Sequence, residues 1–363
     1  MERPLYFSAI AQLMKQVRAT DIHLDPESPP LFRVDGELQD CLGRGLTAEE
    51  TTEMIRSVMT EPQWKKLQEN WEVDFSFEVA EVGHLRANIF YKRGQIAGAF
   101  RYIPDRIPSF SELGLPPVVE RLAELPKGLV LITGATGSGK STTLAAVVDR
   151  INQTRRTHIV TIEDPIEYVH RNKNALISQR EVFSDTRSFQ NALRSTLRQD
   201  PNVVLVGEMR DLESIDLTLT IAETGHMTFA TLHTNSTVQT ITRLIDVFPE
   251  GQQSQVRTQL SFVLQGILCQ QLIPHATGKG RVLALEILVV TPAIRNMIRE
   301  GKIHQIYSVM QSGQNHSGMQ TMNQALMRHL KAGEISLKEC LSRTTEPEEF
   351  QEMIKRERVT IQP

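Results

Sequence analysis

The chain has 363 residues, and at roughly 150 residues per domain this length allows two or three domains that each bury a core. Hydrophobic residues make up 40% and charged residues 23%, with 21 Gly and 17 Pro, which excludes a disordered or collagen-like chain and a disulfide-stapled miniprotein. The formal net charge of −3 gives no overall electrostatic argument for nucleic-acid binding, although a local basic patch remains an alternative.

The cysteines and the apolar runs bear on the compartment. Cys41, Cys269 and Cys340 are odd in number, widely separated and in no CxxC pair, which is typical of a reducing compartment and argues against a zinc ribbon. Charged residues occur by the third position, and no run approaches the roughly 20 apolar residues that a membrane span needs. We therefore expect a cytosolic protein that meets a membrane only through partners.

The first hundred residues predict a small α/β domain with an antiparallel sheet. Residues 21–24 and 31–34 have strand patterns, and Asp35-Gly36 after the second favours a tight hairpin turn. Capping-box spacing at Thr47 to Glu50 predicts a helix over residues 47–60. Further strands are expected where apolar residues alternate or cluster, at residues 73–79, 85–91 and 96–102.

A connector follows, and the pattern then changes. Four prolines lie between residues 104 and 117, as in a linker between compact units. One apolar stripe predicts a helix over residues 252–271, and the chain beyond Pro292 looks helical. Short apolar strands that alternate with helices indicate a parallel sheet covered on both faces, at residues 128–133, 158–162, 203–206, 227–232 and 281–290.

Residues 134–141 match the motif G-x-x-x-x-G-K-[ST] in full, between an apolar strand and a helix. The backbone N–H groups of such a loop and the N-terminus of the next helix form an anion nest. Lys140 is expected to reach the outer phosphates, and the Ser141 hydroxyl to coordinate Mg²⁺. The sequence therefore predicts a nucleoside triphosphate site built from Gly134, Ala135, Thr136, Gly137, Ser138, Gly139, Lys140, Ser141 and Thr142.

The apolar strand at residues 203–206 is followed by Gly207 and Glu208, where a Walker B strand would end. Because Gly207 replaces the usual Asp, the remaining carboxylate Glu208 is either a ligand of metal-bound water or the catalytic base. A strand-capping glutamate without function is the alternative.

Residues 161–167 place three carboxylates just past another strand, where ligands bind in open α/β sheets. Glu163 or Glu167 could orient an attacking water, and a solvated acidic loop is an equal alternative. His226 and His233 bracket a predicted strand and are either sensors of the γ-phosphate or ordinary strand-end residues. A zinc site is disfavoured because no third ligand stands at metal spacing beside them.

Taken together, these motifs make the chain resemble the motor ATPases of secretion systems and type IV pili, and most closely the PilT-like retraction ATPases. In that family's terms, residues 161–167 look like the Asp box, 207–208 like an atypical Walker B motif, and 223–234 like the His box. Residues 293–300 are similar to the C-terminal signature of the retraction class, with Met297 where Leu is expected.

The resemblance implies an α/β fold, with a RecA-like P-loop NTPase core, a smaller PAS-like α/β N-terminal domain and a helical C-terminal region. It also implies a homohexameric ring with ATP and Mg²⁺ bound between domains and subunits. The expected divisions are a PAS-like domain over residues 1–104, a linker over 105–118, the RecA-like core over 119–291 and the helical region over 292–363.

The resemblance also implies roles that the motifs alone leave open. Glu163 becomes the favoured general base and Glu208 the carboxylate on the Mg²⁺ side. His226 and His233 become residues that sense the nucleotide and couple it to domain motion. The arginines expected to reach the phosphates are Arg86 and Arg101 in the N-terminal domain, with Arg194 and Arg198 as further candidates.

We therefore predict a cytosolic Mg²⁺-dependent ATPase that retracts a pilus, lying at the inner membrane through a pilus platform protein. An accessory retraction paralogue is a close alternative and a possible partner. An extension or secretion ATPase is more distant, because those generally carry a tetracysteine zinc insertion. A nucleotide-binding regulator without turnover and a nucleic-acid translocase are alternatives from other classes.

Overall fold

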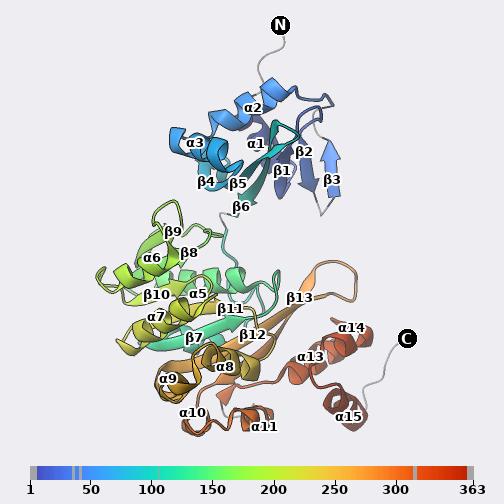
Figure 1. Cartoon of the computed structure of the whole chain (residues 1–363). Coiled ribbons are helices and arrows are strands. Elements are labelled where there is room, and N and C mark those ends of the chain that lie inside the picture. The colour runs from blue at the N-terminus through green and yellow to red at the C-terminus, as the bar shows by residue number, and fades with distance from the viewer. Residues whose placement is uncertain (1–5, 35–36, 41–42, 105, 314–316, 358–363) are drawn as a thin grey trace. The chain divides into compact units, whose positions relative to one another are not determined.

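The computed structural model describes residues 6–34, 37–40, 43–104, 106–313 and 317–357 (Figure 1). They divide into two compact units, each with its own sheet. The first unit comprises residues up to Arg106 together with Pro165–Val169, and the second comprises Ile107–Asp164 and the chain from His170 onward. Within the described ranges, no helix combines the length and the apolar character required to cross a bilayer.

The first unit is built on a six-stranded antiparallel sheet in the order β3-β2-β1-β6-β5-β4. Three helices accompany it, and side chains such as Phe7, Ile55 and Phe100 are buried in one core. The predicted antiparallel α/β character is confirmed, while the Asp35-Gly36 turn lies outside the described residues. The elements are α1 (Phe7–Gln16), β1 (Asp21–Leu24), β2 (Leu31–Val34), β3 (Glu37–Asp40), α2 (Ala48–Ser57), α3 (Glu61–Asn70), β4 (Glu72–Val79), β5 (Gly83–Lys92) and β6 (Gln95–Ile103).

The helix predicted over residues 47–60 is shorter than expected. It begins at the predicted capping box, in which Thr47 and Glu50 bond reciprocally, but it ends at Ser57. A second capping box between Thr60 and Gln63 then starts α3. Because an N-cap residue takes an extended backbone, Thr60 cannot belong to the end of α2, where the apolar stripe had placed it.

The second unit contains a seven-stranded sheet in the order β13-β12-β7-β11-β10-β8-β9, in which every neighbouring pair is parallel except β12 with β13. The strands are β7 (Gly128–Thr133), β8 (His158–Glu163), β9 (Leu176–Glu181), β10 (Val203–Val206), β11 (Met227–Leu232), β12 (Leu264–Pro274) and β13 (Arg281–Val289). α4 (Pro117–Ala123) precedes these strands, and the helices between them are α5 (Lys140–Thr154), α6 (Phe189–Thr196), α7 (Leu212–Glu223), α8 (Thr237–Asp246) and α9 (Glu250–Val263).

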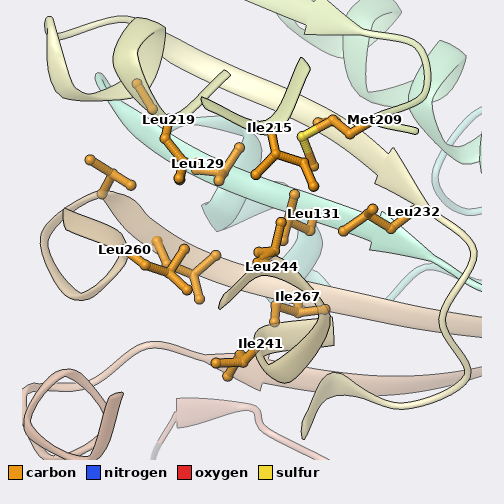
Figure 2. Close-up of a cluster of buried hydrophobic side chains, with 14 of the residues drawn as sticks. Leu129, Leu131, Met209, Ile215, Leu219, Leu232, Ile241, Leu244, Leu260 and Ile267 are labelled. Atoms are coloured by element: carbon orange, nitrogen blue, oxygen red, sulfur yellow. The ribbon is translucent and has the colours of Figure 1, made fainter. Parts of the chain in front are cut away.

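Helices cover both faces of this sheet, which explains why its central strands are apolar throughout. Along β7, Leu129 and Leu131 belong to one buried cluster, shown in Figure 2, and Val130 and Ile132 belong to another. All six residues of β7 are buried. The predicted parallel sheet is therefore present, with one antiparallel strand at its edge.

The helix predicted over residues 252–271 is wrong in its second half. The helix α9 ends at Val263, and β12 begins at Leu264 between β7 and β13. A Cβ on Gly266 would lie 2.8 Å from the Leu122 side chain, so this strand packs tightly on α4. A short apolar run satisfies the helical and the buried-strand pattern equally, and only the neighbouring strands decide between them.

The chain beyond Pro292 is helical as predicted. It forms α10 (Pro292–Arg299), η1 (Ile303–Gln305), α11 (Ile306–Ser312), α13 (Met322–Lys331), α14 (Leu337–Arg343) and α15 (Pro347–Glu357). Figure 1 shows α13, α14 and α15 gathered in one group. Met322, Cys340 and Phe350 from these helices form a buried cluster with Ile273 and Ala284 of β12 and β13.

Candidate nucleotide-binding and catalytic site

The register of the parallel strands brings the predicted site residues of the second unit to one edge. Val206 of β10 lies opposite Ile162 of β8, and Leu232 of β11 lies opposite Thr133 of β7. The phosphate-binding loop, Glu163, Glu208 and His233 therefore all stand at or just beyond strand carboxyl ends, where open α/β sheets bind their ligands. We call this the loop edge.

The loop between β7 and α5 has the backbone conformation that its glycines permit. Gly134, Gly137 and Gly139 have φ angles of 139°, 78° and 88°. A Cβ on Gly134 would lie 2.4 Å from the backbone oxygen of Gln270, so this position also requires glycine for space. The Nζ of Lys140 donates to the backbone oxygens of Gly134 and Ala135 at 2.8 and 3.0 Å.

A glutamine on β12 donates a hydrogen bond to this loop. Gln270 is fully buried, and its Nε2 donates to the backbone oxygen of Ser138 at 2.9 Å. Gln270 was not among the predicted site residues, because residues 252–271 were expected to form a helix. Residues 264–274 contain three glutamines among apolar residues, and a buried amide needs a hydrogen-bond partner, but the sequence does not tell which of the three is buried.

Glu163 is the last residue of β8, and two side chains donate to the same oxygen of its carboxylate. Thr161 Oγ1 lies 2.6 Å from Glu163 Oε1, and Gln179 Nε2 lies 3.1 Å from it. Glu167 is exposed and lies in the segment that belongs to the first unit. The second unit thus places Glu163 at the loop edge.

Glu208 follows β10 and faces two basic groups. Its Oε2 accepts from Arg210 at 3.0 Å, and its Oε1 lies 3.1 Å from His233 Nε2. Arg210 also bonds Asp164 at 3.3 Å. Burial raises the pKa of the Glu208 carboxyl, but the hydrogen bonds and charges of Arg210 and His233 outweigh it and leave the pKa below its ordinary value.

The two predicted histidines lie at opposite ends of β11. His233 follows β11 at the loop edge, whereas His226 precedes it, about 20 Å away along six strand residues. His226 Nδ1 lies 3.0 Å from the backbone oxygen of Ile221, and its ring lines a polar pocket of about 430 Å³ with Arg155 and Arg156. One chain therefore does not bring His226 to the phosphate-binding loop.

Arg86 and Arg101 belong to the first unit, where they are directly opposite each other on β5 and β6. Arg101 Nε lies 2.8 Å from Asp21 Oδ1, and Arg86 Nη2 lies 4.0 Å from Asp74 Oδ1. Directly opposite residues point to the same face of a sheet, so the two arginines form one patch in which each guanidinium group has an aspartate partner.

The remaining two candidate arginines lie on and after α6. Arg194 forms an ion pair with Glu213 in the first turn of α7. Arg198 is exposed beyond the end of α6, shortly before β10 begins.

The described side chains fit Mg²⁺ bound with a nucleotide rather than a metal bound by protein alone. Across the ranges described, no group of three or more His, Cys, Asp and Glu side chains is arranged to hold a metal ion. The second residue of α5, Ser141, supplies a hydroxyl and Glu208 a carboxylate, both of which are the oxygen ligands that Mg²⁺ prefers. Cys269 and Cys340 are buried free thiols, and Cys41 lies outside the described residues.

Comparison with known proteins decides the family. The sequence profile described as "Type II/IV secretion system protein" matches residues 4–342. This chain belongs to that family. The prediction of family membership is confirmed.

Individual relatives are similar over nearly their full length. The twitching motility protein of Neisseria gonorrhoeae is 50% identical over 307 residues, which is 85% of this chain and 82% of the relative. The type IV pilus retraction ATPase PilT of Pseudomonas aeruginosa is 48% identical over 332 residues, or 92% and 96% of the two chains. The type IV pilus ATPase PilU of the same species is 38% identical over 349 residues, or 96% and 91%.

A solved structure is similar as well. The crystal structure of the pilus retraction motor PilT with bound ADP superposes with a TM-score of 0.91 at 50% identity, and it covers 96% of this chain and 100% of that one. This similarity confirms the predicted fold class, a RecA-like core with a smaller N-terminal α/β domain.

The segment that resembles the retraction signature of this family is α10. Ile294 and Ile298 are fully buried in the core of the second unit, so the apolar stripe of this helix packs on its own protein. Arg295 is half-buried, and its Nη1 donates to the backbone oxygens of Ser261 and Phe262 at 2.7 and 3.0 Å. Arg295 thus caps the last carbonyl groups of α9.

Proposed function

We propose that this protein is an ATPase motor that powers type IV pilus retraction. The observation that carries the proposal is the loop edge itself: a complete phosphate-binding loop with Glu163, Glu208 and His233 at neighbouring strand ends. Full-length similarity to a retraction motor with bound ADP supports it.

The proposed chemistry is hydrolysis of ATP to ADP and phosphate. A water oxygen attacks the γ-phosphorus as the bond from that phosphorus to the ADP oxygen breaks, and the water proton passes to Glu163. Lys140 and the loop N–H groups hold the phosphates. Mg²⁺, held by Ser141 with Glu208 on its water shell, would offset phosphate charge.

The assembly belongs to the same proposal. We assign residues 1–104 to a PAS-like domain, 105–118 to a linker, 119–291 to the RecA-like core and 292–363 to the helical region. Six copies would form a ring in which Arg86 and Arg101 reach bound phosphates. The partners would be an inner-membrane platform protein and a retraction paralogue, and the motor would work in the cytoplasm at that membrane.

One specific observation favours the principal retraction ATPase over the accessory paralogue. The chain is 48% identical to PilT and 38% identical to PilU of the same species. Experiments in cells distinguish the two candidate functions. A principal motor can power twitching without a second motor, whereas an accessory motor acts only when a principal motor is present.

Two experiments test the proposal. The purified chain should release phosphate from Mg²⁺-ATP, and Lys140→Ala should weaken binding of a fluorescent ATP analogue. Deleting the gene from its own host should abolish twitching while surface pili accumulate. A deletion strain that twitches normally would contradict a principal role in retraction, and a chain that binds but never hydrolyses ATP would point to a regulator.

A further inference from the structure

We propose that Gln179 is a positioning residue that sets the orientation of the Glu163 carboxylate. This inference rests on the proposed role of Glu163 as general base. Gln179 lies on β9, the edge strand of the sheet, directly opposite Thr161 on β8. Its side chain reaches past Thr161 toward the end of β8, where its Nε2 lies 3.1 Å from Glu163 Oε1.

The orientation of the Gln179 amide is fixed by a second hydrogen bond. Its Oε1 accepts from the backbone N–H of His170 at 2.7 Å. Because a backbone N–H can only donate, the amide oxygen must face His170, and the NH₂ group must face Glu163. The amide therefore offers a donor to the carboxylate and cannot turn without losing both bonds.

The same side chain hydrogen-bonds both residues that flank the segment 164–169. Glu163 stands immediately before residues 164–169 and His170 immediately after them, so Gln179 bonds the loop at its start and at its finish. Thr161 donates to the same Glu163 oxygen at 2.6 Å. Two donors from adjacent strands hold the carboxylate in one orientation, as a positioned general base requires.

Two substitutions separate orientation from charge. Gln179→Leu keeps the volume but removes both hydrogen bonds, so we expect kcat to fall about 10-fold with KM nearly unchanged. Gln179→Glu places a second carboxylate beside Glu163, which raises the pKa of Glu163 and moves the acidic limb of the kcat–pH profile to higher pH.

A matched control exists in the same unit. Gln259 Nε2 donates to Glu223 Oε2 at 2.7 Å, so it makes the same type of bond on α9, remote from the loop edge. Gln259→Leu should leave kcat, KM and the pH profile as in the wild type. Circular dichroism and gel filtration establish that every variant is folded and assembled.

The double variant tests whether Gln179 affects hydrolysis through Glu163. In a Glu163→Gln background, single-turnover hydrolysis should fall less than twofold further on adding Gln179→Leu, because the carboxylate to be oriented is gone. Turnover of Glu163→Gln at the wild-type rate would overturn the base assignment itself. Suppose instead that Glu163→Gln is inactive while Gln179→Leu keeps the wild-type kcat and pH profile. That result would overturn only the positioning role of Gln179. A full 10-fold loss in both backgrounds would overturn it too.

Discussion

His233 Nε2 lies 3.1 Å from one oxygen of Glu208, and Arg210 donates to the other oxygen at 3.0 Å. The carboxylate therefore stays charged at neutral pH, at the loop edge. The preceding residue, Gly207, is as close to β8 as space allows, because a Cβ there would lie 3.0 Å from the backbone oxygen of Ile162. The two residues after β10 are thus a glycine that packs on β8 and a glutamate that carries the charge.

Glu208→Gln should cut turnover about 10²-fold or more and leave ATP binding largely intact. The amide keeps the shape of the side chain but removes the negative charge that faces Arg210 and His233. Phosphate release and fluorescent-nucleotide titration measure the two effects separately. Glu213→Gln, which neutralises the partner of Arg194, is the control and should retain turnover. Wild-type turnover in Glu208→Gln would rule out this catalytic role.

The phosphate-binding loop could be predicted from the sequence because consecutive residues make it. A glycine-rich turn between a strand and a helix must present its N–H groups together, wherever the rest of the chain lies. Much of the antiparallel sheet of the first unit was also predictable, because alternation along strands such as β4 and β5 records which face is buried. Glu163 and Glu208 could be placed at strand ends for the same local reason.

The groups that support these residues could not be predicted, because they come from distant parts of the chain. Gln270 lies beneath Ser138, and Gln179 lies beside Glu163, only after strand order and register are set. Nothing in a lone glutamine indicates its partner. The same holds for Arg295, whose bonds to the end of α9 depend on how α10 packs.

Arg295→Ala should lower the free energy of unfolding by about 1–3 kcal/mol, since it leaves carbonyl groups of Ser261 and Phe262 without their charged donor. Urea denaturation measures the change. Arg299→Ala on the same helix removes an exposed arginine and should change stability by less than about 0.5 kcal/mol. Equal stability of Arg295→Ala and the wild type would refute the capping role.

Asn296 offers a test of whether α10 contacts the pilus machine. Asn296 is exposed, so Asn296→Ala should spare stability and nucleotide binding while abolishing twitching, if this helix contacts the pilus machine. Because Arg295 is structural, loss of twitching in an Arg295 variant alone is not evidence of a partner. Normal twitching in a stably expressed Asn296→Ala strain would exclude such a contact through this residue.

His170 should make the fold sensitive to mild acid. Burial, opposed by Asp149 and aided by Lys173, lowers the pKa of His170 to about 4. The unfolded chain binds this proton at about pH 6.5, so stability is full above that value and falls as the pH drops toward 4. The loss amounts to about 3 kcal/mol. Urea midpoints at pH 7.5 and 4.5 should differ less in His170→Gln, and an unchanged difference would assign the acid sensitivity elsewhere.

The last prediction is that catalysis needs two subunits. Arg86 and Arg101 share one face of the first sheet, and their side chains are 41% and 70% exposed, so both are available to a neighbouring copy. A head-to-tail interface that closes into a ring can present this patch to the loop edge of the next subunit. An arginine supplied in trans accelerates phosphoryl transfer by about 10³- to 10⁵-fold, so isolated subunits should be nearly inactive even when saturated with ATP.

Mixing experiments test this shared site. Arg86→Ala and Lys140→Ala proteins should each be inactive, and their mixture should regain part of the activity, because a mixed interface joins an intact loop to an intact arginine. Arg56→Ala is the control, since Arg56 stacks on Trp64 in α2 and α3 and should not affect turnover. Specific activity of the wild type should also rise steeply with protein concentration. A flat dilution series in a demonstrably monomeric range, together with an inactive mixture, would require that each subunit complete its own site.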